Sequence, residues 1–345
     1  MVSKILINVI TSFYNSEEFM EATYKSLLNQ TYTNWEWICV DDKSTDNTLK
    51  ILQEWAKKDS RIKVIPRDKN GGNAAFGFNS GLPYCNGSHT QILGHDDELT
   101  PDTLEEIVKR INETNADVVI PDVEEINDLL DPYIPNIKRI GIQPFKQLKD
   151  YPLNDRNVVL TPLEAFCLSL NWRIHGWACY STELLKKYKY HEKGMNGDEY
   201  SSREFLLNSN KVVFSKGTYQ YKRRKGSITV KINPRYFDRF ECEEKLQELM
   251  DKNNIEKKYK RLVNRNLLNT YFNCDYKYFT NKDSFSNEEK QQIEKMLHQG
   301  QQLIHKYCSI YDIIKIKTRL FKYKTLYYIY KSIKSYLEKK NLINN

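Results

Sequence analysis

The sequence lacks long apolar runs, paired cysteines and a secretory leader. No window of its 345 residues approaches the roughly 18 consecutive apolar residues of a transmembrane helix. The seven cysteines are scattered and never form a C-x-x-C pair, which indicates reduced residues rather than a disulfide framework or a zinc site. The amino terminus runs straight into a predicted strand, without an apolar region and cleavage site. These absences predict a cytoplasmic location, with peripheral attachment to the inner face of the cell membrane as the open alternative.

Two common nucleotide-binding patterns are also missing. No G-x-G-x-x-G follows the first predicted strand, so the sequence does not fit a dinucleotide-binding dehydrogenase. The glycine-rich segment 70–81, NGGNAAFGFNSG, lacks the Lys and Ser/Thr of a P-loop. Its small residues still let the backbone approach a ligand or another element closely.

The positive charge lies at the carboxyl end. Residues 301–345 contain ten Lys and Arg but only two acidic residues, Asp312 and Glu338, and this difference equals the whole formal net charge of +8. The rest of the chain is therefore balanced, and it contains no base-reading module. We expect no nucleic-acid partner; a nucleic-acid-binding protein that uses the basic tail is the weaker rival.

Hydrophobic periodicity predicts an α/β fold with a parallel sheet. Short apolar runs at 5–12, 35–40, 61–66, 89–93 and 117–121 indicate buried strands, and most of the intervals between them show helical spacing. Strands that alternate with helices require right-handed crossovers. Asn15 and Glu18 are predicted to form a capping box, and Thr100 is predicted to cap a later helix with Pro101 at its first position.

The second half of the chain changes character twice. Residues 122–160 contain four prolines and show no period, which is typical of a functional or disordered loop. A helix is predicted near 161–170, and a strand pair with a basic turn over 211–229. Beyond about residue 231 strands give way to long helices. We therefore predict two domains, 1–230 and 231–345.

Carboxylates follow two of the predicted strands. Asp41 and Asp42 end the strand at 35–40, and Asp96 and Asp97 follow the strand at 89–93. In open α/β sheets, ligands bind outside the carboxyl ends of the strands. These residues therefore suggest ligand contact, although the first pair could only cap a turn and the second could belong to a solvated acidic loop.

Four segments, in order, carry a resemblance to a known family. They are TSFYNSEEFMEATYKSLLNQTYTNWEWICVDDKSTDNT at 11–48, LGHDDELTPDTL at 93–104, GDEYSSREFLL at 197–207 and YKRRKGSIT at 221–229. They resemble the family 2 inverting glycosyltransferases of the GT-A fold, especially bacterial members that build capsule, lipopolysaccharide or exopolysaccharide. The resemblance covers roughly residues 5–230. It implies a Rossmann-like, mostly parallel sheet flanked by helices, here followed by a C-terminal helical extension.

The resemblance implies sugar transfer, with inversion, from a nucleotide-diphosphate sugar to a hydroxyl of a saccharide or lipid-linked saccharide. Asp198 is then the candidate general base, and Glu199 is its competitor. Asp96 would bind a divalent cation, Mn²⁺ or Mg²⁺. The donor-binding residues implied are Ser12, Phe13, Tyr14, Asp41, Asp42, Asn79, Asp96 and Arg224.

The acceptor side is predicted around Trp172, His175 and Trp177, because aromatic faces suit sugar rings. For His175 a packed, hydrogen-bonded core position is an equal alternative, and tryptophans such as Trp172 and Trp177 are more often core residues than surfaces for sugar stacking. Asp198 and Glu199 could be no more than first-turn acids that favour the helix dipole.

The sequence departs from the family pattern at three positions. Gly94 stands where the first Asp of the D-x-D motif is expected, Arg224 where relatives often place a metal-binding His, and Phe78 where an Arg is common. Arginine cannot ligate a cation but can pair with a diphosphate. Metal dependence is therefore an open question, and Arg224 with its neighbours could share the role of the cation or replace it. A degenerate nucleotide-sugar-binding or scaffolding protein is the main rival.

The basic tail has amphipathic helical spacing. Its apolar stripe suits the headgroup layer of an anionic membrane. The same stripe could pack on the catalytic domain or pair with another subunit in a homo-oligomer. The stripe consists of Ile313, Ile316, Leu320, Tyr323, Tyr327, Tyr330 and Leu337.

Overall fold

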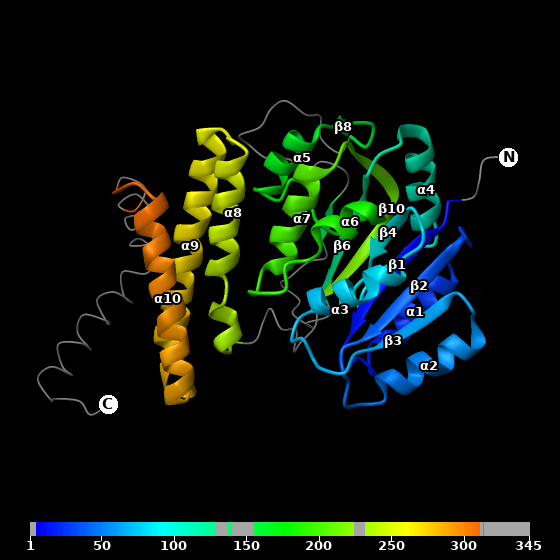
Figure 1. Cartoon of the computed structure of the whole chain (residues 1–345), viewed down its shortest axis with the longest axis horizontal. Coiled ribbons are helices and arrows are strands. Elements are labelled where there is room, and N and C mark those ends of the chain that lie inside the picture. Colours follow the sequence, from blue (N-terminus) through cyan, green and yellow to red (C-terminus); the bar gives the residue numbers. More distant parts are fainter. Residues whose placement is uncertain (1–4, 128–136, 140–154, 224–231, 311–312, 314–345) are drawn as a thin grey trace, which may run out of the picture. The chain divides into compact units, whose positions relative to one another are not determined.

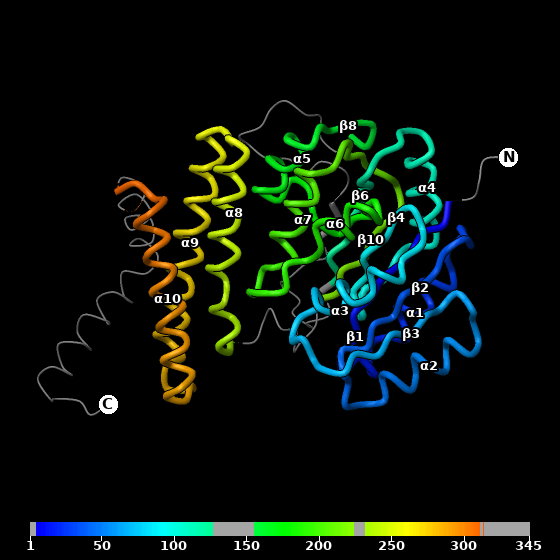
Figure 2. Tube along the Cα trace, in the orientation of Figure 1, coloured from blue at the N-terminus to red at the C-terminus, as the bar shows by residue number. Residues whose placement is uncertain are grey.

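The computed structural model describes residues 5–127, 137–139, 155–223, 232–310 and 313 (Figure 1). The chain forms two compact units, Met1–Lys231 and Ile232–Asn345. The first unit contains the sheet and the second is helical. Figure 2 follows the chain through both units, from blue at the amino terminus to orange in the last described helix.

A mixed sheet with strand order β3-β2-β1-β4-β9-β6-β10-β5 forms the centre of the first unit. The parallel strands are β1 (Ile7–Phe13), β2 (Trp35–Asp41), β3 (Ile62–Pro66) and β4 (His89–Ile92), together with the pair β6 (Val118–Asn127) and β10 (Val212–Arg223). Strand β9 (Cys179–Ser181) is antiparallel to both β4 and β6, so these six longer strands all run in one direction. The predicted α/β class with a mostly parallel sheet is confirmed.

Besides β9, the described residues form three more short antiparallel strands that periodicity did not predict. They are β5 (Glu98–Leu99), β7 (Ile137–Arg139) and β8 (Val159–Leu160). Segments of two or three residues are too short to show an alternating pattern, so only their pairing with β10 or β6 identifies them as strands.

Helices cover both faces of the sheet, which explains why every residue of β1 is buried. One apolar cluster joins one face to α1 (Met20–Leu28), α2 (Thr48–Lys58) and α4 (Thr103–Thr114). The other cluster joins the opposite face to α3 (Ala74–Gly81), α5 (Pro162–Ser169), α6 (Thr182–Tyr188) and α7 (Gly197–Asn208). The first unit is therefore a three-layer α/β/α arrangement.

Two predicted helix starts were wrong, although the helices themselves are confirmed. Helix α1 begins at Met20 without a side-chain cap, because Asn15 has a positive φ of 49° and its side chain binds the backbone of Thr45 instead. Helix α4 begins at Thr103, two residues after the predicted first position. In both cases a tertiary hydrogen bond or a turn displaced the local capping pattern.

The glycine-rich segment forms a helix that the sequence did not predict. A Cβ atom on Gly77 of α3 would lie 2.0 Å from the Ser12 hydroxyl oxygen, so the glycine lets α3 approach the end of β1. Phe78, one of the departures from the family pattern, is buried in the core beside it. The small residues therefore serve helix–strand packing.

The first strand of the pair predicted over 211–229 is confirmed as β10. Strand β10 is continuous to Arg223, with a register shift between Phe214 and Thr218 near Gly217, whose φ is 80°. A Cβ on Gly217 would lie 2.5 Å from the Thr103 backbone, so the bulge also needs glycine for close approach. The basic turn and its second strand, 224–229, lie outside the described residues.

Between residues 232 and 310 the second unit contains three long helices, as predicted. They are α8 (Phe240–Lys252), α9 (Lys257–Asn281) and α10 (Asn287–Tyr307). A capping box between Ser286 and Glu289 starts α10, and Gly300 lets this helix approach the Phe240 ring, where a Cβ would lie 2.7 Å away. Of the apolar stripe in the tail only Ile313 is described, and it packs against the apolar cluster formed by α8, α9 and α10. Among the described helices, none is both long and apolar enough to cross a bilayer.

Candidate functional site

The turns that follow β1 and β2 bind each other. We call residues 14–17 and 44–48 the interlocked turns, because side chains of each bind the backbone of the other. The bonds include Thr45 N to Asn15 Oδ1 (2.8 Å), Ser16 N to Thr48 Oγ1 (2.8 Å) and Asn47 N to Glu17 Oε2 (3.1 Å). This reciprocal bonding holds the two turns together at the carboxyl ends of β1 and β2.

Asp41 and Asp42 are both buried but differ in their partners. The Asp42 carboxylate pairs with Arg67 and accepts from the Gly71 N–H at 3.0 and 3.1 Å. The Asp41 Oδ2 accepts from Ser44 N at 3.2 Å, whereas its Oδ1 is buried and has no hydrogen-bond partner in the described part of the chain. Asp41 therefore keeps an unsatisfied buried acceptor, while Asp42 holds the loop at 67–71.

The three predicted donor contacts at the end of β1 differ in accessibility. Ser12 is buried, and Gly77 packs against its hydroxyl. Phe13 is fully buried and packs on Trp37, with ring centroids 5.8 Å apart. Tyr14 is 46% exposed. Of the three, Tyr14 has the side chain that a ligand can reach.

The turn at residues 94–97, between β4 and β5, is bound to β10. Asp97 is buried; its Oδ2 accepts from the Tyr219 hydroxyl at 2.6 Å and its Oδ1 accepts from Lys222 N at 3.0 Å. The same Tyr219 oxygen accepts from Gly94 N at 2.9 Å. Asp96 is half-buried beside these residues. We refer to residues 94–97 as the 94–97 turn.

The residues of this turn fit a divalent cation that takes its other ligands from elsewhere. Within the described ranges, no three His, Cys, Asp or Glu side chains form a group that could hold a metal. Asp96 supplies one carboxylate, and Asp97 is committed to Tyr219 and Lys222. Mg²⁺ commonly binds one or two protein carboxylates and completes its shell with phosphate oxygens and water. The donor set therefore suits a cation bound together with a diphosphate.

Helix α7 places the two candidate bases at its first turn. Gly197 is required there, because a Cβ would lie 2.3 Å from the His191 carbonyl oxygen. The Asp198 side chain is exposed to solvent. Desolvation by the protein packed around it nevertheless raises its pKa, and the amides of the helix start and the charge of Arg203 oppose that shift. Glu199 instead pairs with Arg203 at 3.7 Å.

Asn79, a predicted donor contact, binds backbone and side-chain groups of the protein in this structure. Its Oδ1 accepts from Tyr190 N at 2.8 Å, and its Nδ2 donates to the Tyr190 carbonyl at 2.8 Å and to Glu192 Oε1 at 2.9 Å. The amide is thus used to join α3 to the segment that leads into α7. Asn79 thus positions the protein backbone in this structure, and its contact with the donor stays a prediction.

The three predicted acceptor-side residues separate into one exposed and two packed rings. Trp172 is 43% exposed, with an unusual φ of 61°, and the Arg203 guanidinium lies 5.3 Å from its ring centroid. His175 is buried, with Nε2 3.0 Å from the Pro121 carbonyl oxygen, as the core alternative predicts. Trp177 packs on Tyr221, with ring centroids 4.8 Å apart. Arg224 lies outside the described residues.

Two residues of this region were missed by the sequence reasoning. Tyr219 lies 122 residues from its partner Asp97, and Arg67 lies 25 residues from Asp42. No local motif joins such pairs, so only the strand order brings them together. The sequence offers one weak indication: Tyr219 and Tyr221 are two residues apart in a predicted strand, so their side chains lie on the same side of it.

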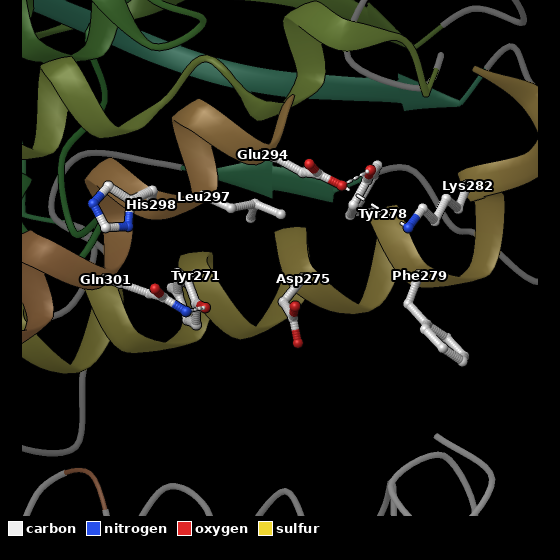
Figure 3. A pocket seen from close by; sticks show the side chains of 9 residues that line it. All are labelled: Tyr271, Asp275, Tyr278, Phe279, Lys282, Glu294, Leu297, His298 and Gln301. Atoms are coloured by element: carbon white, nitrogen blue, oxygen red, sulfur yellow. Dashed lines mark hydrogen bonds and ion pairs between the residues drawn. The ribbon is translucent and has the colours of Figure 1, made fainter. Parts of the chain in front are cut away.

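A separate hollow of about 390 Å³ lies in the helical unit (Figure 3). The Tyr278 hydroxyl donates to Glu294 Oε1 and the Gln301 amide donates to the Tyr271 hydroxyl, each at 2.7 Å. Figure 3 shows these side chains around the hollow. The polar side chains of α9 and α10 thus satisfy one another across this hollow. None of the site residues predicted from the sequence lines it.

Comparison with known proteins identifies the first unit. Residues 8–169 match the model of the family described as Glycosyl transferase family 2. The chain carries a family 2 glycosyltransferase domain. The match includes the interlocked turns, Asp41, Asp42 and the 94–97 turn. The family predicted from the sequence, and with it the assignment as a glycosyltransferase, is confirmed.

Relatives of this glycosyltransferase differ in how much of their length is matched. Glycosyltransferase GlyG of Streptococcus pneumoniae is 28% identical over 233 residues, 65% of this chain and 72% of GlyG. Glycosyltransferase GlyA of the same organism is 28% identical over 225 residues, 65% of this chain but 31% of GlyA. An Escherichia coli enzyme, UDP-Glc:alpha-D-GlcNAc-diphosphoundecaprenol beta-1,3-glucosyltransferase WfgD, is 34% identical over 123 residues, 36% of this chain and 47% of WfgD. The chain thus spans less than half of some relatives.

Solved structures show the same fold. The crystal structure of S. aureus TarS 1–349 in complex with UDP-GlcNAc is similar with a TM-score of 0.61 at 20% identity, covering 87% of this chain and 82% of that chain. The predicted GT-A fold of this glycosyltransferase is therefore confirmed.

Proposed function

We propose that this chain transfers a sugar, with inversion, from a nucleotide-diphosphate sugar to a hydroxyl of a saccharide in bacterial surface polysaccharide synthesis. The observation that carries the proposal is the Asp41 carboxylate. Its Oδ1 is buried without a hydrogen-bond partner among the described residues, at the carboxyl end of β2 in a family 2 domain. A buried acceptor left unsatisfied is costly, and an N–H of a donor nucleobase would satisfy it. We therefore assign Asp41 and the exposed ring of Tyr14 to the nucleoside.

Leaving-group stabilisation is assigned to the 94–97 turn. In the proposed complex Asp96 holds a divalent cation, Mn²⁺ or Mg²⁺, together with the donor diphosphate. When bound, the cation neutralises the negative charge that grows on the departing diphosphate. Asp97, through Tyr219 and Lys222, fixes the backbone of the turn that carries Asp96.

Asp198 is the proposed general base. The acceptor oxygen forms a bond to the anomeric carbon, the bond from that carbon to the diphosphate oxygen breaks, and the hydroxyl proton passes to the Asp198 carboxylate. Glu199 is the poorer candidate because its carboxylate is paired with Arg203. A raised pKa makes the ionised Asp198 carboxylate a stronger base than an ordinary aspartate.

The acceptor side is assigned to Trp172. Arg203 supports one side of its indole, and the ring remains 43% exposed, which suits stacking with a sugar. WfgD is named for a saccharide linked to diphosphoundecaprenol, and another relative is named poly(ribitol-phosphate) beta-glucosyltransferase. We extend the general class to this chain: a saccharide acceptor, free or carried by a lipid, with the basic tail docked on an anionic membrane in the lipid-linked case.

The proposal is tested by screening nucleotide sugars for binding and turnover, with and without Mn²⁺. We expect one donor to bind and to be hydrolysed or transferred, and Asp198→Asn to abolish turnover while donor binding is retained. A wild-type protein that binds a nucleotide sugar but neither hydrolyses nor transfers it with any acceptor tested would support the degenerate binding protein instead.

A further inference from the structure

We infer that Tyr219 is a positioning residue of the 94–97 turn: its hydroxyl holds both ends of the turn, so that Asp96 is kept in place for the diphosphate and its cation. The inference rests on the proposed function and adds a residue to it. Tyr219 lies in β10, more than 120 residues along the chain from the turn that it binds.

The hydroxyl makes two hydrogen bonds to the turn. It donates to Asp97 Oδ2 at 2.6 Å and accepts from Gly94 N at 2.9 Å. Tyr219 is 1% exposed and Asp97 is 3% exposed, so water does not compete for these bonds. Because Asp96 lies between the two bonded residues, its backbone is constrained from both sides.

Gly94 leaves room for the carboxylate that Tyr219 binds. A Cβ atom at position 94 would lie 2.3 Å from Asp97 Oδ2. The Asp97 carboxylate therefore fills the space beside Gly94 that a side chain at that position would occupy. The turn lacks the first carboxylate of the D-x-D pattern, and the Asp97 carboxylate, which is bound to Tyr219, occupies the space beside Gly94.

Tyr219 is itself held firmly. Its backbone pairs with Leu99 of β5 on one side and Val123 of β6 on the other. Its ring stacks against Trp177, with centroids 5.8 Å apart. The hydroxyl is thus placed by two strand pairings and an aromatic contact, as expected for a support rather than a mobile ligand.

Tyr221 provides a matched control. It lies two residues further along the same side of β10 and packs on the same Trp177 ring, with centroids 4.8 Å apart. Its hydroxyl makes no hydrogen bond to the 94–97 turn in the described structure. Removing this hydroxyl makes the same chemical change on the same strand but leaves the turn intact.

The test measures the affinity of UDP by calorimetry, with and without Mn²⁺, in wild type, Tyr219→Phe and Tyr221→Phe. We expect Tyr219→Phe to weaken UDP binding about tenfold with Mn²⁺, the usual effect of losing a hydrogen bond to a charged group, and to leave Mn²⁺-free binding within about twofold. We also expect faster amide exchange at residues 94–97. Tyr221→Phe should change neither quantity. Equal behaviour of the two variants would overturn the inference.

Two further measurements separate the remaining outcomes. If Tyr219→Phe fails to fold, Asp97→Ala removes the same bond from the other side and should show the same Mn²⁺-specific loss; wild-type affinity in Asp97→Ala would contradict the inference. When both variants fold, the loss of binding free energy in the double variant should be smaller than the sum of the two single losses, because both substitutions break the Tyr219–Asp97 bond. If the wild type binds none of UDP, GDP, CDP and dTDP, the proposed function fails, and this inference fails with it.

Discussion

The side-chain amide of Asn79 binds both the N–H and the carbonyl of Tyr190, each at 2.8 Å. The Tyr190 ring packs on Phe78 of α3 and Phe205 of α7, at centroid distances of 5.0 Å in both cases. One residue thus joins two helices on the same face of the sheet. The position of Asp198, at the start of α7, depends on this connection.

We predict that Asn79→Ala lowers the free energy of unfolding by about 1–3 kcal/mol, because it leaves buried backbone groups of Tyr190 unsatisfied. It should also lower kcat more than the affinity for the donor. Urea denaturation and steady-state kinetics measure the two effects. Asn208→Ala is the control, since Asn208 is exposed and bonds only within α7; equal effects of the two substitutions would contradict the prediction.

Asp41 and Asp42 should respond differently to the same substitution. Asp41→Asn should weaken nucleotide binding about tenfold with little change in stability, because its Oδ1 has no partner in the described structure. Asp42→Asn should lower the free energy of unfolding by about 1–3 kcal/mol, because it removes the charge paired with Arg67. Calorimetry with UDP and urea denaturation distinguish the two. A stability loss confined to Asp41→Asn would reverse the assignments.

Asp198→Asn should lower kcat by about 10²–10⁴, the usual contribution of a general base, and leave donor affinity unchanged. Glu199→Gln is the matched control one residue along the same helix turn, and it should lower kcat far less. Turnover assays with saturating donor measure both. If Glu199→Gln were the more damaging substitution, Glu199 would be the base.

The same residue predicts a pH dependence. Desolvation raises the Asp198 pKa above its ordinary value of 3.8, Arg203 opposes this shift, and the neighbouring Tyr180 and Tyr190 are neutral near pH 7. The base must be ionised, so kcat/KM for the acceptor should fall as pH drops, with a midpoint above 3.8. Arg203→Gln removes the opposing charge and should move the midpoint higher. Because the pKa is raised in the folded state, the ionised Asp198 carboxylate lowers the free energy of unfolding. Protonation of this carboxylate at low pH removes that loss of stability.

Trp172 should govern acceptor affinity. Trp172→Ala removes the stacking surface and is expected to raise the acceptor KM by about tenfold while the donor KM stays constant. Tyr84→Ala is the control, because Tyr84 is an aromatic residue of similar exposure, 47% against 43%, in the same unit. An unchanged acceptor KM in Trp172→Ala would remove this residue from the acceptor side.

The basic tail should govern binding to anionic vesicles. Truncation after Ile310 keeps α10 and its buried Leu303 and Ile304, and removes the predicted amphipathic stripe. We expect the truncated protein to lose sedimentation with phosphatidylglycerol vesicles while remaining folded. Full binding by the truncated protein would favour packing on the chain or pairing with another subunit. Light scattering then separates these two alternatives.

Much of the fold could be predicted because its signals are local. The runs at 35–40 and 89–93 became β2 and β4, and the spacing of Leu104, Ile107, Val108 and Ile111 gave the buried face of α4. The sequence could not reveal β9, which completes the sheet with three residues. Helix starts were wrong where the capping side chain bound a distant partner, as Asn15 does with Thr45.

The site was less predictable, because residue type does not show which polar atoms are already satisfied. Adjacent carboxylates at 41–42 and 96–97 read alike in sequence. In the structure Asp42 and Asp97 hold the protein backbone through Gly71 and Lys222. Likewise nothing local distinguishes the packed His175 from the exposed Trp172. The partners that decide these roles lie in other elements, far along the chain.

The interlocked turns bear on how this enzyme can be altered. Because residues 14–17 and 44–48 exchange hydrogen bonds in both directions, neither turn can change independently of the other. A chimera that grafts only one of them from a relative would bring together bonding patterns that do not match. Engineering of donor preference should therefore exchange both turns as a single cassette, together with the strands that carry them.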